Sequence, residues 1–96
     1  MLFIATCADK PDTLQLRLAT RPAHLAFLQS LGPKVRAGGA LLTDDLQGVL
    51  GSLLILEGES DEEIAALLAD DPYAKAGLFQ SVDIKPWRQA IGVSLV

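Results

Sequence analysis

His24 is the only histidine in this chain of 96 residues, and it lies in a segment with the apolar spacing of an amphipathic helix, residues 20–31. At about 100° per residue, its side chain falls among Phe27, Leu28 and Leu31 and not on the opposite, solvent-facing side. Histidine titrates near neutral pH and can act as a general acid, a general base or a metal ligand. A polar ring among apolar side chains also needs a hydrogen-bond partner. The position of His24 therefore indicates a chemical site or a core histidine with an ordinary hydrogen bond.

A carboxylate partner would favour the chemical alternative, because it orients the ring and stabilises its charged form. The candidates are Asp70, Asp71, Asp83 and the acids at residues 61–63. Asp71 precedes Pro72, where it can cap a helical turn, so it has a structural role that does not require His24. The residue pattern leaves the choice among these acids open.

A metal site is the weaker interpretation of His24, since one histidine and one cysteine, Cys7, give no ligand spacing within the chain. We therefore expect no metal ion, haem or other cofactor. Cys7 lies in an apolar segment that is predicted to be buried, and we expect it to be inert. Arg17 and Arg21 could attract an anionic substrate, although a helix arginine can equally be solvated or ion-paired.

Composition excludes several classes of function. The net charge is −4 and the eight Lys and Arg residues form no cluster, which argues against a nucleic-acid partner. Every apolar run is shorter than the ~20 residues that a membrane span requires. The N-terminal segment lacks the basic and apolar regions of a signal peptide, and a single cysteine suits a reducing compartment. We therefore expect a cytoplasmic protein without membrane attachment.

The elements that must position His24 include four predicted strands, which are short apolar or alternating segments bounded by turn residues. They cover residues 2–7, 35–42, 52–57 and 79–87. The third carries large apolar side chains at four successive positions, 53–56, so both of its faces must be dry. In the fourth, Val82 and Ile84 alternate with polar side chains, which predicts one polar face.

The helix around His24 is predicted to be broken. Pro22 lacks a backbone N–H and interrupts the apolar pattern, and Thr20 can serve as a new N-cap just before it. We predict a short helical segment that begins after Asp12 or Thr13, and a second one over residues 21–31.

A second helix has a clear start, because Ser60 and Glu63 have the spacing of a capping box. A residue before proline is pushed out of the helical region, so Asp71 ends this helix. Asp71 can then cap a single turn, which Gly77 closes.

The predicted order is strand, helix, strand, strand, helix, strand, which is the ferredoxin-like arrangement of an α+β fold, an antiparallel sheet with both helices on one face. It forms one domain, residues 1–96, in which residues 88–96 could add a further strand or a dimer arm. The other face of the sheet is left bare, and 50% of the residues are hydrophobic, which is high for a chain of this length. We therefore expect a homodimer in which a second copy covers the bare face.

Three segments of the chain resemble the YciI-like (YCII-related domain) family: RLATRPAHL at 17–25, DDPYAKAGL at 70–78 and VDIKPW at 82–87. The resemblance covers nearly the whole chain and implies a ferredoxin-like unit that assembles into a dimeric α+β barrel. It implies a catalytic pair made of His24 and Asp71. Ser52 matches a recurring family position and could contact a substrate, and Tyr73, in the second segment, could contact a substrate or only pack.

The leading functional hypothesis is an enzyme that transfers protons on a small aromatic or carbonyl-bearing substrate. The resemblance implies chemistry like that of related dehydrochlorinases and isomerases. In this hypothesis Asp71 accepts a hydrogen bond from one ring nitrogen of His24, and the other nitrogen is the base. The alternative is a non-catalytic dimeric module, a ligand binder or interaction partner, in which His24 and Asp71 only hold two helices together.

Overall fold

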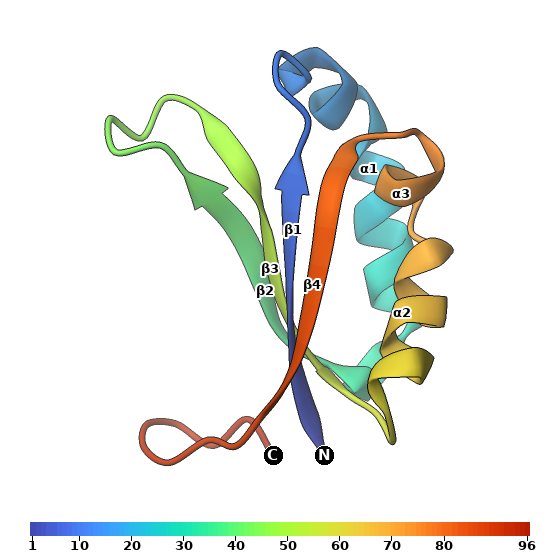
Figure 1. Ribbon diagram of the computed structural model, residues 1–96, viewed down its shortest axis with the longest axis vertical. Helices are drawn as coiled ribbons and strands as arrows, with labels where there is room; N and C mark the ends of the chain where they lie inside the picture. Colours follow the sequence, from blue (N-terminus) through green and yellow to red (C-terminus); the bar gives the residue numbers. More distant parts are fainter.

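The computed structural model describes all 96 residues and contains a four-stranded antiparallel sheet with its helices packed on one face (Figure 1). The elements, in order, are β1 (Leu2–Asp9), α1 (Leu14–Ser30), the short helix η1 (Gly32–Lys34), β2 (Val35–Leu42), β3 (Val49–Glu57), α2 (Asp61–Ala69), α3 (Pro72–Lys75) and β4 (Phe79–Trp87). The strand order across the sheet is β2-β3-β1-β4. This is the predicted ferredoxin-like α+β fold.

Side chains alternate between the two faces of the sheet, as strand geometry requires. One face packs on the helices and forms the core, a cluster of buried apolar residues: Phe3, Ala5, Leu54, Leu56, Ile64 and Leu68. Because Ala5 pairs with Leu54 in register, the same face also holds Cys7 and its partner Ser52. The core thus continues along β1 and β3 into the region where polar side chains begin.

The predicted helix caps are largely confirmed. Ser60 Oγ accepts a hydrogen bond from the backbone N–H of Glu63, at 3.1 Å. The carboxylate of Glu63 accepts from the N–H of Glu59 and not from Ser60, so the reciprocal half of the capping box is displaced by one residue. Asp71 caps α3 and accepts from the N–H of Tyr73, at 2.9 Å.

The predicted break in the first helix is wrong. α1 runs without interruption from Leu14 to Ser30, with Pro22 inside it and Thr20 as an ordinary helical residue. Pro22 lies on the exposed side of α1, where water can reach the carbonyl of Leu18 that loses its partner. The packing of α1 on the sheet and on α3 therefore outweighs the local preference for a break.

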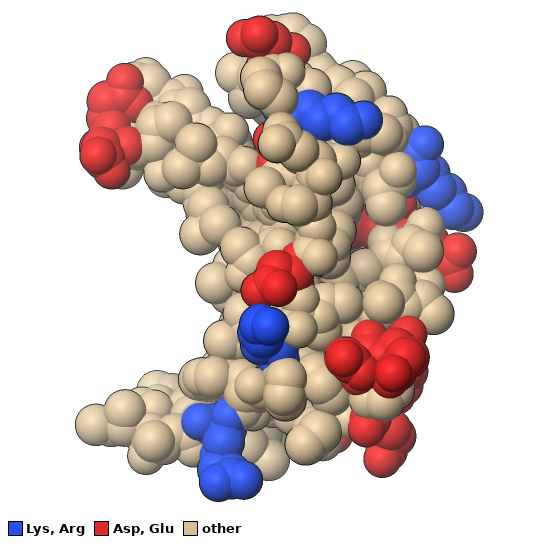
Figure 2. All heavy atoms as spheres, viewed as in Figure 1, with Lys and Arg blue, Asp and Glu red and all other residues tan.

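The face of the sheet opposite the helices carries no element of this chain (Figure 1). Ile4, Thr6, Leu53 and Ile55 alternate with the core residues and point to this helix-free face. The space-filling view shows that this side is hollowed and mostly uncharged, between the β2–β3 hairpin and the C-terminal tail (Figure 2). The molecule thus presents a concave apolar surface.

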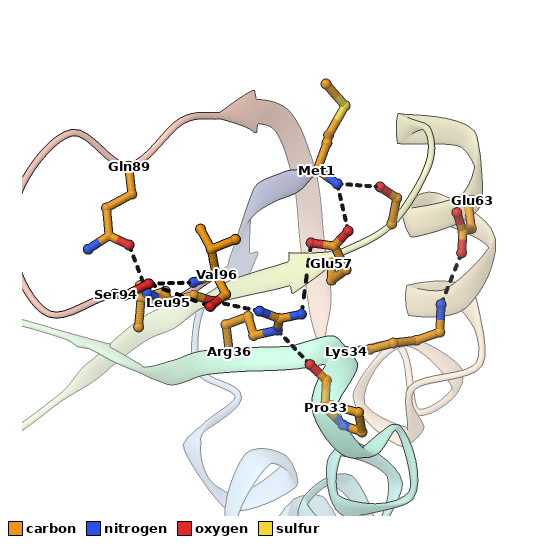
Figure 3. Close-up of polar contacts among 11 residues, drawn as sticks. Met1, Pro33, Lys34, Arg36, Glu57, Glu63, Gln89, Ser94, Leu95 and Val96 are labelled. Carbon is orange, nitrogen blue, oxygen red and sulfur yellow. Dashed lines mark hydrogen bonds and ion pairs between the residues drawn. The ribbon is translucent and has the colours of Figure 1, made fainter.

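The C-terminal tail, residues 88–96, forms no strand in the single chain. It folds back toward β2, where the guanidinium of Arg36 donates to the carbonyl of Leu95, at 2.8 Å (Figure 3). The side-chain amide of Gln89 holds the loop, donating to two tail carbonyls and accepting from the N–H of Leu95. Ile91 and Val93 remain almost fully exposed, and the role of this segment as a dimer arm stays a prediction.

None of the helices has the length and apolar character needed to cross a membrane.

Candidate active site

The centre of the candidate site is a hydrogen-bonded pair of buried side chains from α1 and α3. His24 Nδ1 lies 2.9 Å from Asp71 Oδ1 and 3.0 Å from Oδ2. Asp71 is completely buried and His24 is 6% exposed. The Asp71 carboxylate also caps α3. One side chain therefore holds both the first turn of α3 and the imidazole of His24.

The ring of His24 is held flat against Tyr73, with 3.8 Å between the ring centroids and 14° between the planes. Its second nitrogen, Nε2, makes no hydrogen bond within the chain. Asp9 Oδ1 is the only fully buried side-chain nitrogen or oxygen atom that lacks a hydrogen-bond partner. Because Nε2 also lacks a partner, it cannot be fully buried. The ring is therefore fixed in orientation by Asp71 and Tyr73, and it keeps one nitrogen accessible.

A cavity of about 320 Å³ lies beside this ring, and His24, Tyr73, Arg17, Arg21 and Ser52 are among the residues that line it. Small residues of β2, at positions 38–40, also line this cavity. The lining combines apolar surface with a few convergent polar groups, as is usual for small-molecule sites.

Arg17 joins the polar groups of this cavity into one network. Its guanidinium donates to Asp9 Oδ2 at 2.8 Å and to Ser52 Oγ at 2.7 Å. The guanidinium carbon also lies 4.9 Å from the centroid of the Tyr73 ring, within cation–π range. Both Arg17 and Asp9 have buried side chains. The charge of Arg17 is thus matched within the protein.

Arg21 differs from Arg17, although both lie on α1 and line the cavity. It is exposed and forms no ion pair, so its charge is available at the cavity mouth. Two other acids considered as partners for His24 lie elsewhere. Asp70 is an exposed residue at the end of α2, and Asp83 is an exposed residue of β4, 4.0 Å from Lys85.

Asp9 is a site residue that the sequence-based interpretation missed, because the first strand is predicted to end at residue 7. The strand continues to Asp9, which brings its carboxylate to the helix-packed face. The signal that could have found it is the spacing: residue 9 continues the alternation of Phe3, Ala5 and Cys7.

Gly51 brings β3 very close to β1 beside the site. A Cβ atom at this position would lie 1.9 Å from the carbonyl oxygen of Cys7, so only glycine fits. The close approach places Ser52, the next residue, opposite Cys7 in the ladder. The position of the Ser52 hydroxyl is therefore set by backbone packing.

Cys7 is completely buried beneath this network. Burial, and then the negative charges of Asp71 and Asp9, raise the pKa of its thiol from 9.0 to about 12. Burial likewise raises the pKa of the Tyr73 phenol. Both groups are therefore neutral at physiological pH, and Cys7 lacks the thiolate that a nucleophile or a metal site would require.

The shifted thiol gives a prediction about alkaline stability. Between pH 9.0 and about 12 the unfolded chain releases the Cys7 proton while the native protein retains it, so the free energy of unfolding falls as pH rises. We expect the free energy of unfolding, measured with urea under reducing conditions, to fall between pH 8 and pH 10 in both proteins. The fall should be about 1 kcal/mol larger for the wild type than for Cys7→Ala. Equal losses in the two proteins would contradict the burial of a protonated thiol.

Side chains that could hold a metal do not gather here, since no group of three or more His, Cys, Asp and Glu residues is suitably placed.

Comparison with known proteins shows similarity to one domain family, to two relatives and to a solved structure. The model of the YCII-related domain matches residues 1–88. Protein YciI from Escherichia coli O6:H1 is 40% identical over 96 residues, covering 93% of this chain and 98% of that protein. A protein from Emericella nidulans, named "Derivative of benzaldehyde biosynthesis cluster protein C", is 34% identical over 84 residues, covering 78% of this chain and 84% of that protein.

A solved structure is also similar, that of the 5-chloro-2-hydroxyhydroquinone dehydrochlorinase TftG from Burkholderia phenoliruptrix AC1100, in complex with 2,5-dihydroxybenzoquinone. It superposes with a TM-score of 0.84 and 39% identity, over 94% of this chain and 96% of that chain.

Proposed function

The chain belongs to the YCII-related domain family, and from this premise we propose that it is an enzyme that transfers protons on a small hydroxylated ring through His24 and Asp71. The substrate class comes from TftG, whose structure holds 2,5-dihydroxybenzoquinone. The candidate reaction is loss of hydrogen chloride from a chlorinated hydroquinol.

The observation that carries this proposal is the contact of both Asp71 oxygens with Nδ1 of His24. A carboxylate accepts hydrogen bonds only, so the proton of a neutral imidazole must sit on Nδ1. The lone pair is then on Nε2, the nitrogen without a partner in the chain. This is the arrangement of an oriented general base with a stabilised conjugate acid.

The reaction balances without an oxidant. A ring hydroxyl gives its proton to Nε2, and the imidazolium returns that proton to the carbon that bears chlorine. A second hydroxyl then loses its proton to Nε2 while chloride departs with the electrons of the C–Cl bond. The products are a hydroxylated benzoquinone, a proton and chloride, and each proton transfer uses the same nitrogen.

The remaining lining residues suit a planar, oxygen-rich and partly ionised substrate. Arg21 offers an unpaired positive charge at the cavity, Ser52 offers a hydroxyl, and Tyr73 offers an aromatic surface beside the base. We propose these three as substrate contacts, with Arg17 holding Ser52.

We also propose that the protein is a homodimer in which a second copy covers the helix-free face. The concave surface seen in Figure 2 is mostly uncharged, and Ile4, Leu53 and Ile55 point to it from the sheet, so a single chain leaves apolar side chains open to water. A second copy of the chain would bring an equally apolar sheet, and the two sheets together would enclose a shared interior.

A second candidate function is a non-catalytic ligand-binding or interaction module. The low exposure of His24 and its stacking on Tyr73 favour this alternative, because a clamp between α1 and α3 needs no access to solvent. The two candidates differ in whether Nε2 exchanges protons with a bound molecule.

The test is an assay of chloride release with 5-chloro-2-hydroxyhydroquinone under anaerobic conditions, which prevent oxidation of the ring by oxygen. We expect the wild type to release chloride and form the hydroxylated quinone well above the rate without protein. Binding of 2,5-dihydroxybenzoquinone without any chloride release would overturn the enzymatic proposal for this substrate class and favour the module.

A further inference from the structure

The ion pair between Asp9 and Arg17 is the most heavily buried charged contact outside the proposed catalytic pair. The side chains are 5% and 8% exposed, and Arg17 Nη1 lies 2.8 Å from Asp9 Oδ2. Asp9 extends from the end of β1 and Arg17 from the start of α1, so the pair joins the central strand to the helix that carries His24.

Stability alone explains this pair poorly. Removing two charges from water carries a large desolvation penalty, and a buried pair often contributes no more than apolar side chains of the same size. The second carboxylate oxygen, Asp9 Oδ1, is buried and accepts no hydrogen bond from the chain. An incompletely bonded buried carboxylate calls for another explanation, and the other end of Arg17 supplies one.

That other end fixes the hydroxyl of Ser52. Arg17 Nη2 donates to Ser52 Oγ at 2.7 Å, and Ser52 donates no hydrogen bond within the chain. Guanidinium can only donate, so it must occupy a lone pair of the hydroxyl oxygen. The hydroxyl proton therefore points away from Arg17, and Ser52 lines the cavity.

We propose that Asp9 is a positioning residue, which through Arg17 keeps the Ser52 hydroxyl as a hydrogen-bond donor toward a carbonyl or phenolate oxygen of the bound ring. The inference rests on the proposed function and deepens it, since it assigns an acceptor oxygen to the substrate at this point. Arg17 and His24 both contact the ring of Tyr73, so the donor and the base lie at the same end of the cavity.

Asp9 has two effects in this arrangement. Its charge compensates the buried guanidinium, which would otherwise draw an anion onto itself, and its hydrogen bond restricts the rotation of the guanidinium plane. Without Asp9, Arg17 could turn toward the cavity, and the Ser52 hydroxyl could then orient its proton freely. Whether the Ser52 hydroxyl donates a hydrogen bond to the substrate therefore depends on the Asp9 carboxylate, which does not itself touch the substrate.

The experiment uses the coloured compound 2,5-dihydroxybenzoquinone as a binding probe, so it does not depend on turnover. Ser52→Ala should weaken binding about tenfold and remove the shift of the visible absorption band that a hydrogen bond to a quinone oxygen produces. Ser52→Thr, which keeps the hydroxyl, should restore both. Ser30→Ala, an exposed serine at the end of α1, is the matched control.

Asp9→Asn should weaken binding several-fold in the wild-type background and have no further effect in Ser52→Ala, because the two residues act through one hydrogen bond. Asp12→Asn, a nearby exposed aspartate, is the control. Arg17→Lys keeps a positive charge for Asp9 but loses the fork that reaches Ser52, and it should reproduce the Ser52→Ala spectrum. If Asp9→Asn does not fold, Arg17→Lys carries this part of the test.

Additive effects of Asp9→Asn and Ser52→Ala, or an unchanged spectrum in Arg17→Lys, would overturn the proposal, as would failure of the wild type to bind the probe. Failure here is distinguishable from failure of the proposed function. Normal chloride release with unchanged binding in Ser52→Ala refutes only the positioning role. The expected spectral changes without chloride release refute only the enzymatic activity.

Discussion

Asp71→Asn should leave the protein folded and slow its turnover by about three to four orders of magnitude. Asparagine is a good N-cap, so its amide oxygen can still accept from the N–H of Tyr73 and hold α3. Its NH₂ group would then face His24 and donate to Nδ1. The ring proton is forced onto Nε2, and the nitrogen that faces the cavity can no longer accept a proton.

His24→Ala should have a comparable effect, since it removes the base itself and the expected loss is about a hundred- to ten-thousand-fold in kcat. The measurement is chloride release under saturating substrate, together with circular dichroism to establish folding. Asp70→Asn is a close control, because it makes the same chemical change one residue earlier, at an exposed side chain without a partner. If His24→Ala and Asp71→Asn both fold and turn over at the wild-type rate, the pair is a structural clamp.

A charge in the middle of the helix-free face should convert the proposed dimer to monomers. Leu53 points to this face from β3, and Leu53→Asp would bury a carboxylate without a partner in the interface. The penalty of several kcal/mol should raise the dimer dissociation constant more than a hundredfold.

Size-exclusion chromatography with light scattering at micromolar concentration measures this effect directly. Ala65→Glu, which places a carboxylate on the exposed side of α2, should leave the mass of the dimer unchanged. A wild-type protein that is a stable monomer under the same conditions would contradict the homodimer.

The fold was predictable wherever local chemistry and packing agree. β2 and β4 have the predicted bounds, and Ser60 and Asp71 cap the helices expected of them. Pro22 misled the prediction because a local rule was applied to a helix that is held by tertiary contacts, with Arg17 and His24 buried on either side of the proline. Propensity describes an isolated segment, and it cannot weigh the contacts of α1 with a sheet whose strands are distant in sequence.

The site was predictable in part. An apolar helix position identified His24, and the family resemblance, not the residue pattern, selected Asp71 among the acids. Asp9 was missed because an aspartate before Lys10-Pro11 has the composition of a turn. Its role depends on the register of β1 and on the reach of Arg17 from α1, and neither can be obtained from residue types alone.

The strand order has a consequence for the synthesis of this protein. β1 is an inner strand, and both of its neighbours, β3 and β4, follow it in the chain. While the chain is being made, β1 therefore emerges with two open edges and an apolar face, and it waits for residues as distant as Trp87 before its second edge is covered. Strands that wait for distant partners fold slowly and are prone to pair with other chains. We therefore expect the open edges and apolar face of β1 to be a site of unwanted pairing in the nascent chain, until β4 is free to cover the second edge.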